Sequence, residues 1–188
     1  GQKDYASARK ALGNVVALNI IIGVAFMVIS LLFLDKILLF FGASENTLQY
    51  AREYMEIILY GNVVTHMYLG LNAVMRSGGH PQRSMAMTIL TVILNAILDP
   101  IFIFVLDWGI RGAAIATILA QIVALTWILI SFTNKQEMLH FESGIFKLDR
   151  RIVTASLSIG MAPFLMNVAA CVIVIFINNG LQQHGGDL

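Results

Sequence analysis

Five long apolar runs, almost free of charge, fill most of the chain and limit what it can fold into. A run of about 18 or more apolar residues is long enough to cross roughly 30 Å of hydrocarbon as a helix. Helices also satisfy their own backbone groups, which lipid cannot do. The sequence therefore predicts an all-α, polytopic integral membrane helical bundle. The five expected transmembrane helices cover residues 11–34, 54–75, 84–106, 112–132 and 152–181.

The composition excludes several other classes of protein. Of the 188 residues, 58% are hydrophobic and 12% are charged, whereas soluble domains are about 45–50% apolar and about 25% charged. The net charge of +1 provides no basic surface, so no nucleic-acid partner is expected. The HExxH, GxSxG and CxxC motifs are all absent from the sequence, so we do not expect an enzyme.

Basic residues alternate between the two ends of the expected spans. Nine of the twelve lie in segments 1–10, 76–83 and 134–151, and the other three are Lys36, Arg52 and Arg111. Cytoplasmic loops of membrane proteins carry the excess of Lys and Arg. We therefore expect the first set of segments to be cytoplasmic in an inner (plasma) membrane, with the N-terminus inside and the C-terminus outside.

The chain divides into two parts around a more polar connection. Residues 1–133, with four spans, are predicted to belong to an N-terminal lobe, and residues 152–188 to contribute the first helix of a C-terminal lobe. Residues 134–151 are the expected cytoplasmic linker, as either an amphipathic segment at the interface or an ordinary solvated loop. The missing initiating Met and the odd number of spans lead us to expect a piece of a longer protein.

The third span carries a carboxylate inside an apolar run. Thr91, Asn95 and Asp99 recur every fourth residue and share one helix face. A charge at membrane depth costs at least about 2.5–3.5 kcal/mol, and acids that stay there are usually functional. Pro100 follows directly, and it is expected to kink the helix and to free the Ala96 carbonyl. The pattern predicts a functional polar site in this helix.

The next span has polar residues at a matching depth. Counted from the short hairpin between the two spans, Thr117 lies level with Asp99, and Gln121 follows one turn later. Carboxylate, amide and hydroxyl oxygens suit a proton or a small hard cation such as Na⁺. We predict a cation site at Asp99, Asn95 and Thr117, with Thr91 and Gln121 as candidates for lining the pathway. The alternative is that these groups only bond helices together while Asp99 stays protonated.

Other spans hold weaker candidates. Asn62 and His66 in the second span are predicted to line the pathway. In the fifth span Pro163 is expected to kink the helix, and Asn167 to contact a substrate.

Several stretches together resemble the multidrug and toxic compound extrusion (MATE) family of secondary transporters. The most specific are NAILDPIFIF at 95–104 followed by WGIRGAAIAT at 108–117. Four others agree in order: GQKDYASARKALG from Gly1, residues 51–55 leading into the second span, VMRSGGHPQ at 74–82, and LSIGMAPFL at 157–165. The resemblance covers nearly the whole chain.

The resemblance implies a twelve-helix transporter of two six-helix lobes, of which this chain covers the third to seventh helices. Prokaryotic members hold Na⁺ or H⁺ with acid, amide and hydroxyl groups on their first, fifth and sixth helices. Asn95, Asp99 and Thr117 match the positions on the latter two. Some members also carry an acid on the seventh helix, and here Cys171 stands near that position.

The function expected from these observations is secondary antiport. Amphipathic organic cations or drugs would leave the cell in exchange for Na⁺ or H⁺, by a protein that is a monomer at full length, lies in the lipid bilayer and needs no cofactor besides the coupling ion. Three alternatives stay open: a related flippase for lipid-linked oligosaccharides, a membrane scaffold subunit without transport, and a membrane enzyme. A flippase is expected to place basic residues in the cavity to hold a phosphate.

Overall fold

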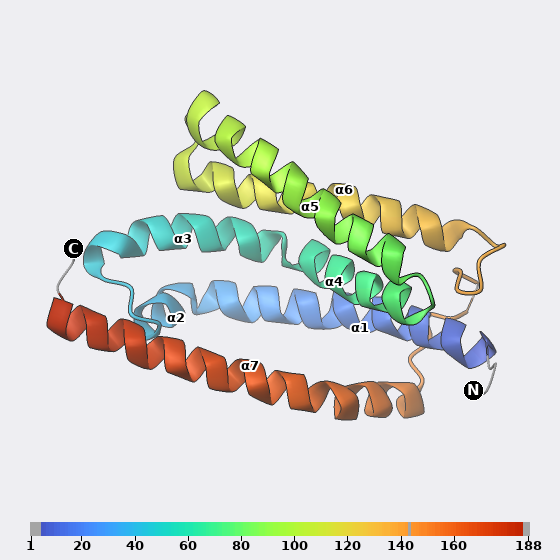
Figure 1. The fold of residues 1–188 in the computed structure, drawn as a ribbon. Coiled ribbons are helices and arrows are strands. Elements are labelled where there is room, and N and C mark those ends of the chain that lie inside the picture. Colours follow the sequence, from blue (N-terminus) through green and yellow to red (C-terminus); the bar gives the residue numbers. More distant parts are fainter. Residues whose placement is uncertain (1–4, 143, 186–188) are drawn as a thin grey trace.

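The computed structural model describes residues 5–142 and 144–185, and this part of the chain is helical without any strand (Figure 1). The helices are α1 (Tyr5–Leu32), α2 (Leu34–Phe40), α3 (Glu45–Tyr60), α4 (Asn62–Ser77), α5 (Pro81–Pro100), the π-helix η1 (Ile101–Val105), α6 (Gly109–Thr133) and α7 (Arg150–Gly185).

The expected transmembrane helices are present, with one important difference. Four are long and apolar enough to cross a membrane, namely α1, α5 continued by η1, α6 and α7. The segment predicted as the second span, 54–75, is not one continuous helix: it comprises the end of α3 and most of α4, which meet at an angle of 57° and together are long and apolar enough to form one bent span. The break lies at Gly61, where the side chain of Ile118 from α6 occupies the space that a Cβ would need. A residue that lacks a Cβ therefore lets α6 approach the backbone between α3 and α4.

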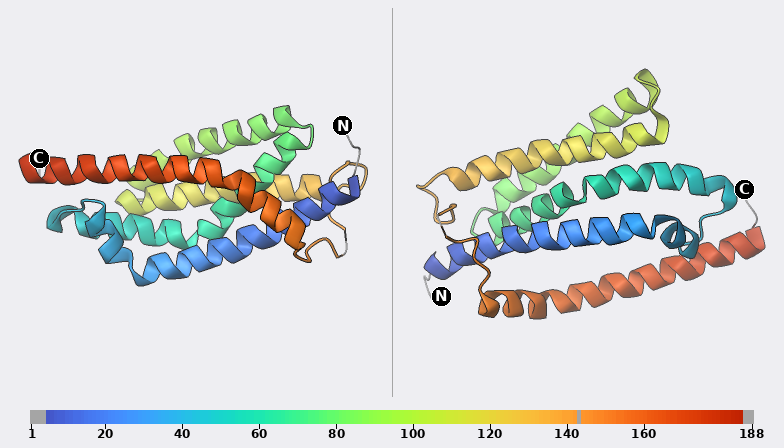
Figure 2. Two further views of the ribbon diagram at one scale, coloured as in Figure 1. Left: turned by 90° about the horizontal axis from the view of Figure 1, so that it is seen from below. Right: turned by 180° about the vertical axis from the view of Figure 1, so that it is seen from behind.

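The loops are sorted to the two ends of the bundle (Figure 1). The start of α1, the α4–α5 turn and the α6–α7 connection lie at one end, whereas α2 and the α6 start lie at the other. Figure 2 shows the same arrangement from below and from behind. The segments expected to be cytoplasmic thus share one end of the molecule.

The core lies between α1, α4, α5 and α6. Buried apolar side chains from all four helices form one cluster, consisting of Leu12, Val16, Met67, Tyr68, Leu71, Met75, Met87, Ala124, Ile128 and Phe132. On α6 four alanines are fully buried, at 114, 116, 120 and 124. Small side chains bring helix backbones close together, which replaces the hydrophobic driving force that lipid does not supply.

Helix α7 lies beside the bundle and is exposed along most of its length. Near its C-terminal end Asn178 and Asn179 donate through Nδ2 to the carbonyls of Phe41 and Phe40, at 3.0 and 3.3 Å. These carbonyls belong to the C-terminal end of α2, and the last carbonyls of a helix have no hydrogen-bond partner within that helix. Pro163 lies inside α7, and Figure 2 (left) shows a bend in the N-terminal, orange part of the helix.

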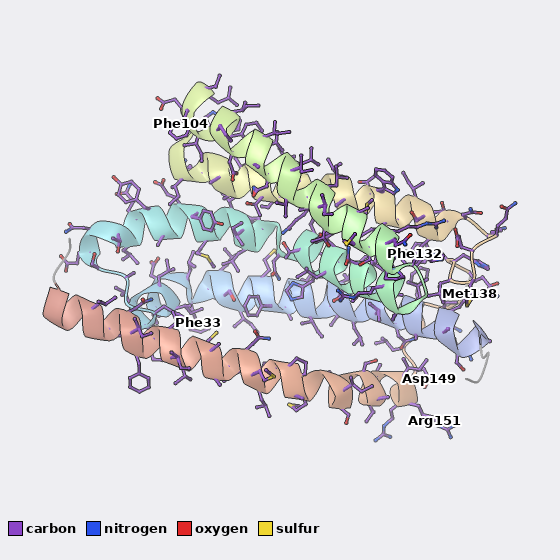
Figure 3. All side chains as sticks on the ribbon, viewed as in Figure 1. Phe33, Phe104, Phe132, Met138, Asp149 and Arg151 are labelled. Atoms are coloured by element: carbon purple, nitrogen blue, oxygen red, sulfur yellow. The ribbon has the colours of Figure 1, made fainter. Side chains whose placement is uncertain are left out.

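The connection between α6 and α7 is folded against the bundle. Asn14 of α1 is 1% exposed, donates to the carbonyl of Lys147 at 3.2 Å and accepts from the N–H of Asp149 at 2.8 Å. Gly13 leaves no room for a Cβ because the backbone of Ile145 lies against it. Figure 3 shows Phe132, Met138, Asp149 and Arg151 at this same end of the molecule. Within the described residues the connection is irregular and is held against α1 by these contacts.

Glu137 fastens the first part of this connection to the α4–α5 turn. Its carboxylate lies 2.7 Å from Arg83 Nη1 and 3.0 Å from His80 Nε2. The hydrogen bond from Arg83 is the main reason why the pKa of Glu137 is lowered, and the charges of Arg83 and His80 act in the same direction. A lowered carboxyl pKa stabilises the folded state above the unfolded pKa, and this contribution is lost as pH falls through the folded pKa.

We therefore expect Glu137→Gln to release residues 134–142 from the bundle. Hydrogen–deuterium exchange of this peptide, corrected for the intrinsic rate, should be slow in the parent at pH 6 and faster at pH 3. In the variant it should be fast at both pH values, whereas Glu45→Gln at the opposite end should behave as the parent does. Equal protection in parent and Glu137→Gln would show that the ion pairs do not hold the connection.

Candidate cation-binding site

Asn95, Asp99 and Thr117 lie together between α5 and α6. The side-chain amide of Asn95 donates through Nδ2 to Asp99 Oδ1 at 3.0 Å and to Thr117 Oγ1 at 3.3 Å. The Thr117 hydroxyl in turn donates to the carbonyl of Ala113 at 3.0 Å. The structure thus brings the three residues predicted to bind a cation into one hydrogen-bonded group.

Local sequence explains how α5 presents its two residues. Asn95 and Asp99 are four apart and so lie one above the other on the same helix face. The irregularity expected at Pro100 takes the form of a π-helical turn over Ile101–Val105, with Leu106 N–H bonded to the Ile101 carbonyl at 2.9 Å. Such turns are rare and frequently occur at functional sites. The wider turn begins directly after Pro100, two residues beyond the carboxylate, and the span continues past the proline.

Asp99 has no ion-pair partner among the residues that the structure describes. None of the ion pairs among residues 5–142 and 144–185 involves Asp99, and its side chain is half-buried. Asp99 accepts a hydrogen bond from the amide of Asn95, which also reaches the hydroxyl of Thr117, and both of these side chains carry an oxygen that a hard cation can use. The donor set therefore fits a proton or a small metal cation.

A second polar contact lies one turn further along α6. Thr65 of α4 donates to Gln121 Oε1 at 2.6 Å, so Gln121 is bonded across to α4 and not to Asp99. Thr91, one turn before Asn95, contacts the hydroxyl of Tyr68 at 3.2 Å and the carbonyl of Met87 at 2.8 Å. These residues continue the polar face of α5 and α6 toward the other end of the bundle.

The weaker candidates lie apart from this group. Asn62 donates to the carbonyl of Gly23 on α1 at 2.8 Å, and His66 Nδ1 lies 3.0 Å from the carbonyl of Asn62. Asn167 is exposed on α7 and donates to the carbonyl of Pro163 in its own helix. Cys171 is also exposed. The structure does not bring Asn62, His66 or Asn167 to Asp99.

Two further residues, Thr65 and Tyr68, make hydrogen bonds with this polar face. Thr65 and Tyr68 both lie in the second expected span, and neither is among the predicted site residues. The spacing from Asn62 gave a signal for Thr65, because i and i+3 share a helix face. For Tyr68 the signal was absent, because its partner Thr91 lies on another helix.

The described helices define a multi-pass helical membrane protein, with a half-buried polar group between two of its spans. A family model described as MatE matches residues 1–101, and the chain belongs to this family. The resemblance in the sequence is thereby confirmed.

The sequences of curated relatives align with almost the whole chain. The multidrug export protein MepA of Staphylococcus haemolyticus (strain JCSC1435) is 30% identical over 185 residues, which are 98% of this chain and 41% of that protein. The protein of the same name from Staphylococcus aureus (strain NCTC 8325 / PS 47) is 26% identical over the same shares. The chain thus spans less than half the length of these relatives.

Solved structures have the same fold. A MOP superfamily transporter from Pyrococcus furiosus, whose binding pocket is described as of reverse polarity, superposes with a TM-score of 0.81 at 27% identity over 97% of this chain and 42% of its own. An inward-facing MATE family transporter superposes with a TM-score of 0.84 at 23% identity, over 98% of this chain and 48% of its own, and this likeness concerns the fold alone.

Proposed function

We propose that the chain is part of a secondary antiporter that exports amphipathic organic cations in exchange for Na⁺ or H⁺. The observation that carries the proposal is the group formed by Asp99, Asn95 and Thr117, a half-buried carboxylate with oxygen-bearing neighbours and no cationic partner among the described residues. Family membership supports export, because the related MepA proteins are named multidrug export proteins.

The contacts of Asn95 suggest how this group accepts an ion. Its Nδ2 atom lies within hydrogen-bond distance of both Asp99 and Thr117, so a donor with partial positive charge already bridges the two oxygens. A cation that replaces this donor can use the same two oxygens. A 180° rotation of the amide then presents Oδ1 as a third ligand, and protonation of Asp99 is the corresponding event for H⁺.

Coupling requires that the ion and the drug prefer different access states. A ligand shifts a conformational equilibrium only by its difference in affinity between the two states. Asp99 would cycle between an ion-bound and an ion-free form, and the protein would bind the organic cation more tightly when the carboxylate is free. Many apolar side chains, several of them Met and Phe, are available in the spans to accept the apolar part of such a compound.

The orientation and the lobes are part of the proposal. The end that holds the start of α1, the α4–α5 turn and the α6–α7 connection would face the cytoplasm, because nine of the twelve basic residues belong to these segments. Residues 1–133 would belong to the first lobe, 134–151 would link the lobes, and α7 would open the second. At full length the protein would have twelve helices and act as a monomer.

Efflux from cells tests the proposal. Cells that express the full-length protein are loaded with ethidium, a fluorescent organic cation, and export is followed after a Na⁺ or H⁺ gradient is imposed. Faster export than in cells with an empty vector, in response to at least one gradient, is the expected result. Equal export rates in cells with the protein and with the empty vector would contradict the proposal. The flippase and scaffold alternatives would then be favoured.

A further inference from the structure

The approach of α6 to the end of α5 depends on one glycine. A Cβ built on Gly112 would lie 2.6 Å from the carbonyl oxygen of Phe102, 2.7 Å from its carbonyl carbon and 3.1 Å from its Cβ. Real Cβ atoms essentially never come closer than 3.0 Å, as this one would to the Phe102 carbonyl, and ordinary contact begins at 3.4 Å. Any side chain at this position would therefore push the two helices apart.

The group that faces Gly112 cannot easily move. It is backbone, and the Phe102 carbonyl accepts the N–H of Trp108 at 3.1 Å, across the hairpin that joins the helices. The rings of Phe102 and Trp108 are also in contact, with centroids 5.3 Å apart. Gly112 thus packs against a turn that is held by its own hydrogen bond and ring contact.

The same approach sets the distance across the predicted cation site. Phe102 follows Asp99 by three residues, and Gly112 precedes Thr117 by five, so the close contact lies on the outer side of the site. In the structure, Asn95 Nδ2 lies within hydrogen-bond distance of both Asp99 Oδ1 and Thr117 Oγ1. If α6 moved away, a single small ion could no longer touch both oxygens.

The distance between the oxygens of Asp99 and Thr117 matters more for binding a metal cation than for binding a proton. A hard metal cation must be held by several oxygens at short, defined distances, whereas a proton binds to one carboxylate oxygen. We propose that Gly112 is a positioning residue that adapts the site to Na⁺ as the coupling ion, by keeping Thr117 within reach of a cation on Asp99. The inference rests on the proposed function and adds to it the choice of ion.

The test uses the full-length protein in proteoliposomes, with ethidium as the transported compound. Three forms are compared: the parent, Gly112→Ala, and Gly160→Ala in α7 as a control, because a Cβ on Gly160 meets no atom of the described residues within 4 Å. The Na⁺ concentration for half-maximal transport and the Na⁺-induced rise in melting temperature are measured. Ethidium affinity in Na⁺-free buffer reports whether the fold is intact.

For Gly112→Ala we expect the half-saturating Na⁺ concentration to rise roughly tenfold or more and the melting shift to shrink accordingly. Ethidium affinity without Na⁺ should stay within about twofold, and Gly160→Ala should match the parent. Gly112→Ser should reproduce the alanine variant, because its Cβ meets the same atoms.

Three results would overturn the inference. One is an unchanged Na⁺ dependence in Gly112→Ala. Another is the joint loss of Na⁺ response and ethidium binding, which would make Gly112 a requirement of the fold. The third is a parent that responds to a proton gradient alone, which would leave the proposed function standing. A parent that exports with neither gradient would instead overturn the proposed function.

Discussion

Replacing Asp99 with asparagine is expected to reduce cation-driven export by at least about tenfold, which corresponds to about 1.4 kcal/mol or more. The amide keeps the size of the side chain and its hydrogen bond with Asn95, but it cannot hold the negative charge that binds Na⁺ or H⁺. Export of ethidium under an imposed gradient, at equal abundance in the membrane, is the measurement. The loss should be in rate and not in the amount of protein.

The matched control is Asp107→Asn, the same substitution in the hairpin that follows the same span. Asp107 is exposed and has a φ of 56°, a conformation that asparagine also adopts readily. This variant should export as the parent does. If Asp99→Asn exported equally well, Asp99 would be a structural residue and the alternative of helix bonding without ion binding would hold.

The second large effect is expected for Asn14→Ala at the opposite end of the bundle. Asn14 is almost fully buried and makes three hydrogen bonds to backbone groups, to the carbonyls of Lys10 and Lys147 and from the N–H of Asp149. Each such bond contributes about 0.5–1.5 kcal/mol, so the free energy of unfolding should fall by about 2–4 kcal/mol. Denaturation of the purified protein in detergent measures this change.

Asn167→Ala is the control for this prediction. Asn167 is exposed, and its one hydrogen bond stays within α7, so its loss should change the free energy of unfolding by well under about 1 kcal/mol. Trypsin cleavage after Lys147 should also become faster in Asn14→Ala only. Equal stability of the two variants would show that Asn14 does not hold the α6–α7 connection.

The cation-site residues could be predicted because the relevant geometry is local. Asn95 and Asp99 share a face by helical periodicity, and a short hairpin fixes the depth of Thr117 on the next helix. The structure places them within hydrogen-bond distance, as the count along both helices indicates. Their role in binding an ion stays a prediction.

The features that depend on distant contacts could not be predicted. The break at Gly61 reflects packing against Ile118, which lies on another helix, and apolar composition alone does not separate a broken span from a continuous one. Likewise the anchoring of residues 145–149 depends on Gly13 and Asn14, more than 130 residues earlier. The local sequence of neither segment indicates which residues it packs against.

The central claim, that an ion gradient drives export through this protein, is tested most directly by transport against a gradient. Purified full-length protein is reconstituted into liposomes with equal ethidium on both sides, and a Na⁺ or H⁺ gradient is then imposed. The account predicts that ethidium accumulates on the side from which the ion moves away under at least one gradient, and that the ionophore that dissipates this gradient abolishes the accumulation. Ethidium that stays equal on both sides under both gradients would contradict it.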